Sequence, residues 1–158
     1  MSEGERDNAG VIAPPPLIYL LAFFAAWAAE RKFHHHIPIL PDESGKWLGY
    51  ILIAVGLTVD IVAFLQFMRA KTAVIPYRPA THVVSNGVYR FTRNPMYVGA
   101  TLMYVGGAFV INSYLPLLLL PLVLVLMQRG VIYREEAYLE RKFGAEYLAY
   151  KERVRRWL

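Results

Sequence analysis

Polar side chains crowd the start of a long apolar run in the segment YRFTRNPMYVG, residues 89–99. Pro95 suits the first turn of a helix and Asn94 is a good N-cap, so a helix is predicted to begin here. Because a helix N-terminus already carries partial positive charge, arginines at this position are unusual. They are explained by a carboxylate or phosphate bound among them, or by snorkelling to a membrane surface. The polar side chains are Tyr89, Arg90, Arg93, Asn94 and Tyr97.

Asp60 is the one acid deep inside an apolar stretch, and Gly56 lies one helical turn before it. An ionisable group within hydrocarbon is a candidate for function, and a helix-packing residue hydrogen-bonded to a neighbour is the alternative. Three glycines, Gly99, Gly106 and Gly107, narrow one side of the helix predicted after Pro95. Small residues let another backbone or a ligand approach closely, and we expect helix packing.

A metal site is disfavoured by the spacing of the histidines. His34, His35 and His36 are consecutive, and consecutive residues of a helix point about 100° apart, so the three do not converge on one ion. The chain contains no cysteine, which excludes disulfides, thiolate catalysis and cysteine metal sites.

The elements that position these residues are predicted to be membrane helices, because 56% of the 158 residues are hydrophobic and the mean hydropathy is positive. A spanning helix needs roughly 20 residues. We expect an all-α membrane bundle of about four spans followed by cytoplasmic C-terminal helices, with the third and fourth spans forming a hairpin that turns near Asn112 and Ser113. The apolar blocks run over residues 17–29, 47–68, 96–111 and 114–127.

The distribution of positive charge predicts the orientation. With four spans, 14 of the 17 lysine and arginine residues lie on the side that holds both termini and the second loop, so this side should be cytoplasmic. We expect the inner membrane of the cell. The basic net charge then serves contact with anionic lipid, and no nucleic-acid partner is implied.

The remaining segments complete the predicted organisation. Residues 1–13 are expected to be a disordered tail, and residues 14–158 one membrane domain. The loop from Arg69 to Asn94 is long for a compact protein, and its valine, isoleucine and tyrosine content argues for an ordered, functional segment. After Met127 the fourth span continues into an amphipathic helix that breaks at Gly144, and a second helix begins near Ala145.

Two blocks of the sequence carry a family resemblance. They are SNGVYRFTRNPMYVG at residues 85–99 and REEAYLERKFGAEYLAYKERV at residues 134–154. These blocks resemble the isoprenylcysteine carboxyl methyltransferase family and, more broadly, membrane methyltransferases that include phospholipid methyltransferases. That family carries G-x-Y-x-x-x-R-H-P-x-Y-x-G, followed by E-E-x-x-L-x-x-x-F-G-x-x-Y-x-x-Y. The match covers residues 80–155, half of the chain.

The resemblance implies an S-adenosylmethionine site on the cytoplasmic side and a lipid or other lipophilic methyl acceptor, for example an isoprenylcysteine-like carboxylate. On this reading we expect Arg93 and Tyr97 at the polar edge of the reaction centre and Glu136 in an orienting or structural role, and these three form the expected catalytic group. The cofactor contacts that the resemblance implies are Thr81, His82, Val83, Val84, Tyr89, Asn94, Pro95, Met96, Tyr97 and Glu135.

The chain departs from the family pattern at two positions. Asn94 replaces the usual histidine, and an amide keeps the hydrogen bonding of a neutral imidazole but does not titrate. Val131 stands where the isoprenylcysteine enzymes have an arginine that contacts substrate, while Arg129 and Arg134 lie nearby. These departures leave the methyl acceptor open.

The implied chemistry is direct displacement at the methyl of the sulfonium. A carboxylate nucleophile needs no base, and because charge disappears in the transition state, a dry site favours its reaction. An amine nucleophile needs a proton acceptor such as Glu136 or Asp60. Two alternatives remain: a membrane reductase of the sterol-reductase type that binds NADPH, and a noncatalytic membrane scaffold.

Overall fold

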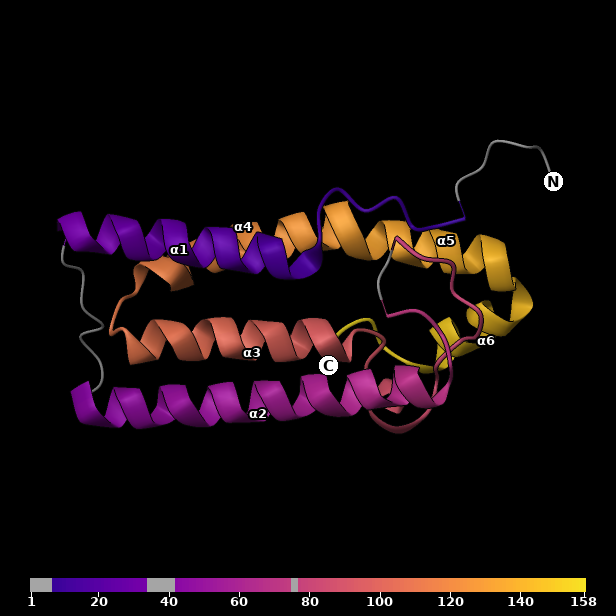
Figure 1. The fold of residues 1–158 in the computed structure, drawn as a ribbon, viewed down its shortest axis with the longest axis horizontal. Coiled ribbons are helices and arrows are strands. Elements are labelled where there is room, and N and C mark those ends of the chain that lie inside the picture. The colour runs from indigo at the N-terminus through magenta and orange to yellow at the C-terminus, as the bar shows by residue number, and fades with distance from the viewer. Residues whose placement is uncertain (1–6, 34–41, 75–76) are drawn as a thin grey trace.

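The computed structural model describes residues 7–33, 42–74 and 77–158, and its regular elements in these ranges are all helical. Four long helices form two antiparallel pairs (Figure 1). Helix α1 (Pro15–Phe33) lies beside α4 (Leu115–Met127), and α2 (Asp42–Arg69) lies beside α3 (Pro95–Val110). The predicted all-helical class is confirmed. His34, His35 and His36 fall outside the described residues.

Two helices among the described residues are long and apolar enough to cross a membrane. One is α2 from Glu43 to Arg69, and the other is the continuous helix Leu115–Phe143 that contains α4. Helix α1 carries Glu30, Arg31 and Lys32 in its last turns, and α3 has 16 residues. The four predicted helices therefore exist, while two of them meet the requirements of a span by themselves.

Helices α2 and α3 pack most closely, through glycines that face backbone. A Cβ atom built on Gly56 would lie 2.5 Å from the carbonyl oxygen of Gly99, and one on Gly49 would lie 2.6 Å from the carbonyl oxygen of Gly106. Real side chains do not fit such distances, so these glycines bring the two backbones together. Gly107 instead faces the ring of Phe23 in α1. The expectation of helix packing for the glycines of α3 is met.

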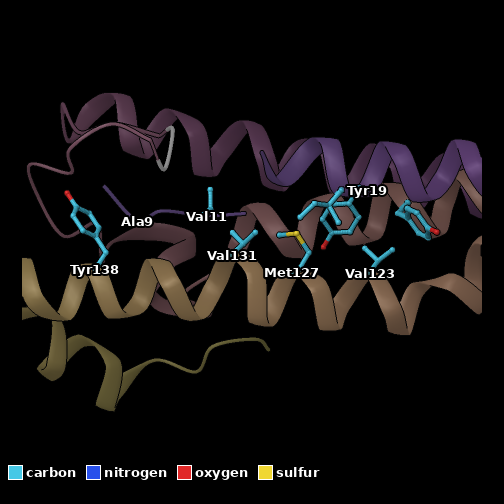
Figure 2. Packing of buried hydrophobic residues seen from close by; sticks show 9 residues of the cluster. Ala9, Val11, Tyr19, Val123, Met127, Val131 and Tyr138 are labelled. Carbon is cyan, nitrogen blue, oxygen red and sulfur yellow. The ribbon is translucent and has the colours of Figure 1, made fainter. Parts of the chain in front are cut away.

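A hydrophobic cluster joins α1 to the long helix that starts with α4 (Figure 2). Met127 and Val131 are fully buried, and Tyr19 of α1 packs edge-to-face on Tyr104 of α3 with ring centroids 6.0 Å apart. Ala9 and Val11 from the N-terminal segment complete the cluster. The core therefore extends from the helix pair towards the end of the molecule that holds α5.

Residues 7–13, which the sequence assigns to a disordered tail, pack on this long helix. The helix widens into a π-helix over Gln128–Ile132, and the carbonyl of Gly130 there accepts a hydrogen bond from the amide of Ile12 at 3.1 Å. The side chain of Asp7 pairs with Lys142. The missing Cβ of Gly130 leaves room for Ile12, so the segment fits where the helix is widest.

The C-terminal helices follow the predicted break. Helix α5 (Tyr133–Phe143) continues the long helix, Gly144 adopts φ 53°, and α6 (Ala145–Arg153) follows. A positive φ favours glycine, so Gly144 permits the sharp turn that folds α6 back (Figure 1). A single 3-10 turn, η1 (Gly87–Arg90), lies in the connection between α2 and α3.

Candidate active site

A cavity lies where the α2–α3 connection, the start of α3 and helices α5 and α6 meet. Its volume is about 140 Å³, below the about 300 Å³ at which pockets for drug-sized ligands begin. A cavity of this volume accommodates part of a nucleotide-sized ligand.

The structure gathers the predicted site residues around this cavity. Nine of the ten predicted cofactor contacts line it, and so do all three members of the expected catalytic group, Arg93, Tyr97 and Glu136. Thr81 does not. Its amide donates to the hydroxyl of Thr72 at 2.9 Å, and its own hydroxyl donates to the carbonyl of Lys71. The nine that line the cavity are His82, Val83, Val84, Tyr89, Asn94, Pro95, Met96, Tyr97 and Glu135.

Tyr97 and Glu135 form one polar pair in the cavity wall. The hydroxyl of Tyr97 donates to the Glu135 carboxylate, 2.8 Å and 2.9 Å from its two oxygens. Tyr97 comes from the first turn of α3 and Glu135 from the first turn of α5, so the bond ties the two helices together. It also fixes the orientation of the carboxylate.

Glu136 binds two guanidinium groups. Arg156 donates from Nε to Oε1 at 2.9 Å and from Nη2 to Oε2 at 2.7 Å, while Nη2 of Arg93 lies 3.1 Å from Oε1. The hydrogen bonds that Arg156 donates to Glu136 raise the pKa of the Arg156 guanidinium. Both carboxylate oxygens of Glu136 are occupied, so this residue holds the two guanidinium groups in place. The orienting or structural role expected from the sequence stays a prediction.

Arg93 is buried with part of its hydrogen-bonding capacity unused. Its side chain is 8% exposed, and Nε and Nη1 have no partner among the described residues. A buried donor of a charged group that lacks a partner lowers the stability of the folded protein. In natural proteins such a donor is usually satisfied by a bound water, ion or ligand. The guanidinium is therefore the part of the wall most suited to an anion.

Asn94 does not cap α3 with its side chain, contrary to the sequence prediction. It occupies the N-cap position without a side-chain capping bond, and its Nδ2 donates to the carbonyl of Arg156 at 2.9 Å. An N-cap accepts hydrogen bonds through its side-chain oxygen, whereas here the amide nitrogen is used to hold a distant segment of the chain.

Buried tyrosines form another part of the cavity wall. The hydroxyl of Tyr150 donates to the carbonyl of Tyr89 at 2.8 Å, and Tyr147 packs edge-to-face on Tyr150. Burial raises the pKa of all three phenols, Tyr89, Tyr147 and Tyr150. They stay protonated and uncharged at neutral pH, which keeps this side of the cavity apolar.

Two further residues singled out by the sequence lie away from the cavity. Asp60 is on the α2 face that meets Gly99, and its Oδ1 is buried without a partner in the described residues. Val131 is buried in the hydrophobic cluster beside Met127. Arg129 is exposed, and Arg134 donates to the carbonyl of Gly10, so neither of these arginines replaces the family's substrate contact in this cavity.

Sequence reasoning missed several lining or supporting residues. Tyr147 and Tyr150 occupy the two tyrosine positions of the Y-x-x-Y pattern, which was a usable signal. Arg156 lies in the basic stretch RVRRWL, where nothing distinguishes it from its neighbours until the fold brings it to Glu136. Phe67 at the end of α2 also lines the cavity, as an apolar residue among many.

The residues present fit a ligand that carries a carboxylate, polar hydroxyl or amino groups, and a flat aromatic ring. Arg93 offers the carboxylate two donors that have no partner in the described part of the chain, and the oriented carboxylate of Glu135 offers acceptors. An apolar surface is supplied by Val83, Val84, Met96 and Leu139. S-adenosylmethionine has all three parts.

Comparisons with known proteins agree with the resemblance. The sequence profile of the phospholipid methyltransferase family matches residues 45–146. Protein-S-isoprenylcysteine O-methyltransferase A of Arabidopsis thaliana is 31% identical over 124 residues, which cover 75% of this chain and 63% of the relative. The probable protein-S-isoprenylcysteine O-methyltransferase of Oryza sativa is 29% identical over 122 residues, 73% of this chain and 64% of the relative.

The protein-S-isoprenylcysteine O-methyltransferase of Schizosaccharomyces pombe is 35% identical over 100 residues, 56% of this chain and 42% of the relative. The chain thus spans less than two thirds of the length of these relatives. No solved structure matches.

Proposed function

Since the chain belongs to the phospholipid methyltransferase family, we propose that it is a membrane methyltransferase that transfers a methyl group from S-adenosylmethionine to a lipophilic acceptor. The observation that carries the proposal is the cavity: nine predicted cofactor contacts line it, and so does Arg93, whose Nε and Nη1 have no partner among the described residues. Methyltransferase names among the relatives support the reaction class.

The roles of the polar residues follow from their partners. Arg93 would bind a carboxylate through Nε or Nη1, the two nitrogens that Glu136 leaves unpaired. Glu135, held by the hydroxyl of Tyr97, would accept hydrogen bonds from ligand hydroxyl or amino groups. When bound, S-adenosylmethionine would supply an electrophilic methyl group.

The apolar wall contributes by excluding water. Valine and methionine side chains and the uncharged tyrosines surround the polar groups, so a bound ligand would lie in a medium of low dielectric constant, where fixed charges act more strongly. Alignment of donor and acceptor in such a site lowers the barrier to group transfer without a dedicated base.

The acceptor is proposed to be lipophilic because the long helices expose their apolar side chains. Leu118, Leu122 and Val125 of α4 are 65%, 55% and 48% exposed. An apolar groove between α3 and α4, lined by Val98, Leu102 and Leu124, lies beside the part of α3 that carries Tyr97. An isoprenylcysteine-like carboxylate is one acceptor that combines an apolar chain with a nucleophile.

The membrane arrangement remains part of the proposal. We place α1 and α3 in the bilayer beside the two helices that meet the span requirements. Both termini and the cavity would then lie on the cytoplasmic side of the inner membrane, where most of the lysines and arginines fall.

Titration calorimetry on the detergent-purified protein tests the proposed function. Binding of S-adenosylmethionine in the micromolar range, with no binding of NADPH, is the expected result. Binding of NADPH alone would replace the proposal with the reductase alternative. If the folded protein bound neither, the donor site would not exist.

A further inference from the structure

The last five residues, 154–158, fold back from α6 across the beginning of α3, and we name them the C-terminal strap (Figure 1). The carbonyl of Arg155 accepts from the amide of Arg93 at 2.9 Å. The carbonyl of Arg156 accepts from the hydroxyl of Thr92 at 3.1 Å and from Nδ2 of Asn94 at 2.9 Å. These backbone contacts fix the strap against the cavity independently of its side chains.

The side chain of Arg156 reaches from the strap to α5. It binds both oxygens of Glu136, and its guanidinium lies over the ring of Tyr133, 4.7 Å from the centroid. Because Arg156 occupies Glu136 in a fork, Arg93 reaches the same carboxylate through Nη2 alone. A carboxylate that faced Arg93 without this competition would form two hydrogen bonds with it, since paired bonds are the favoured geometry of arginine and carboxylate.

The contact between Arg156 and Glu136 thereby keeps Nε and Nη1 of Arg93 from hydrogen bonding to Glu136. Its Nε and Nη1 are buried at the cavity wall without partners among the described residues, and a ligand carboxylate would satisfy them. We propose that Arg156 is a positioning residue: by occupying Glu136 it leaves the guanidinium of Arg93 available to bind the carboxylate of a ligand. This inference rests on the proposed function, because it assigns a role within the same site.

Replacing Arg156 with methionine tests the role, because the backbone bonds of the strap remain. Glu136 is then free to bind Arg93 through two bonds and to draw it from the ligand. Arg155→Met is the matched control: it removes the same charge from the neighbouring position, where the side chain is exposed. Thermal unfolding of each variant shows whether it is folded.

Two nucleosides serve as probes in calorimetry. S-adenosylhomocysteine carries a carboxylate, whereas 5′-methylthioadenosine has the same adenosine and thioether without the amino acid part. Arg156→Met should weaken binding of S-adenosylhomocysteine about tenfold, or 1.4 kcal/mol, and leave binding of 5′-methylthioadenosine unchanged. Arg155→Met should change neither affinity.

A second substitution separates positioning from a merely structural role. In the Arg156→Met background, Glu136→Gln removes the charge that captures Arg93, so affinity for S-adenosylhomocysteine should recover at least in part. If Arg156 and Glu136 only held the structure together, the second substitution should weaken binding of S-adenosylhomocysteine further. Arg156→Met could instead leave the affinity for S-adenosylhomocysteine unchanged and raise the KM for an acidic acceptor tenfold. The carboxylate that binds Arg93 would then belong to the acceptor, and the positioning role of Arg156 would still hold.

Two results would overturn the inference: unchanged affinity and unchanged KM in Arg156→Met, or equal weakening of both nucleosides together with a lower unfolding temperature. Wild-type protein that binds neither nucleoside would instead overturn the proposed function, and the carboxylate site with it.

Discussion

Removing one hydroxyl group, in Tyr97→Phe, tests the polar pair at the centre of the candidate site. The hydroxyl donates to the Glu135 carboxylate at 2.8 Å and 2.9 Å. A hydrogen bond to a charged group contributes about 1.5–3 kcal/mol net. If the bond holds Glu135 in its ligand-binding orientation, its loss should raise the Kd for S-adenosylhomocysteine about 10- to 150-fold. Titration calorimetry on the detergent-purified variant measures this change.

Tyr104→Phe is a matched control on the same helix. It removes the same group from a tyrosine that is 4% exposed and lies outside the cavity lining, and whose hydroxyl has no partner in the described part of the chain. The Kd should therefore equal that of the wild type, and the unfolding temperature should be equal or higher, because an unsatisfied buried hydroxyl is lost. A Kd of Tyr97→Phe within twofold of the wild type would show that this hydrogen bond does not hold Glu135 for ligand binding.

Two further predictions concern the scaffold. Gly99→Ala places a Cβ 2.7 Å from the carbonyl oxygen of Gly56, so we expect a loss of about 1–3 kcal/mol through overpacking, seen as a lower unfolding temperature in detergent; an unchanged temperature would contradict the close approach of α2 and α3. Burial raises the pKa of Tyr89, Tyr147 and Tyr150, so folding retains protons that the unfolded chain releases above about pH 10. The contribution of these phenols to the free energy of unfolding is then fully present below pH 10 and falls above it, by up to about 1.4 kcal/mol per pH unit for each phenol. Thermal scans should show that the unfolding temperature of Tyr147→Phe falls less steeply above pH 10 than that of the wild type.

Helix boundaries were predictable because local residues set them. Pro95 begins a helix as predicted, and Gly144 ends one at the predicted break. The predicted hairpin describes the chain order of α3 and α4 correctly. However, the main neighbour of α3 is α2, and the main neighbour of α4 is α1. This pairing depends on which glycines of two distant helices come into register, and hydropathy alone does not contain that information.

The composition of the candidate site was predictable to the extent that the two motif blocks supply it. Its hydrogen-bond arrangement was not. Asn94 has the sequence signature of a cap, yet its side chain binds the C-terminal strap. Arg156 lies 20 residues from Glu136 and 63 from Arg93 in the sequence, and the turn at Gly144 brings it to both. The π-helix that accommodates residues 7–13 likewise depends on a contact between the chain's beginning and Gly130.

We propose that Arg93 and Glu135 enclose a methyl donor next to lipid. Incubating the purified protein in native lipid with methyl-labelled S-adenosylmethionine, and then extracting the lipid, tests it most directly. We predict label in the lipid extract of the wild type and its loss in folded Arg93→Ala and Glu135→Ala variants. Undiminished labelling in both variants would show that neither side chain holds the methyl donor.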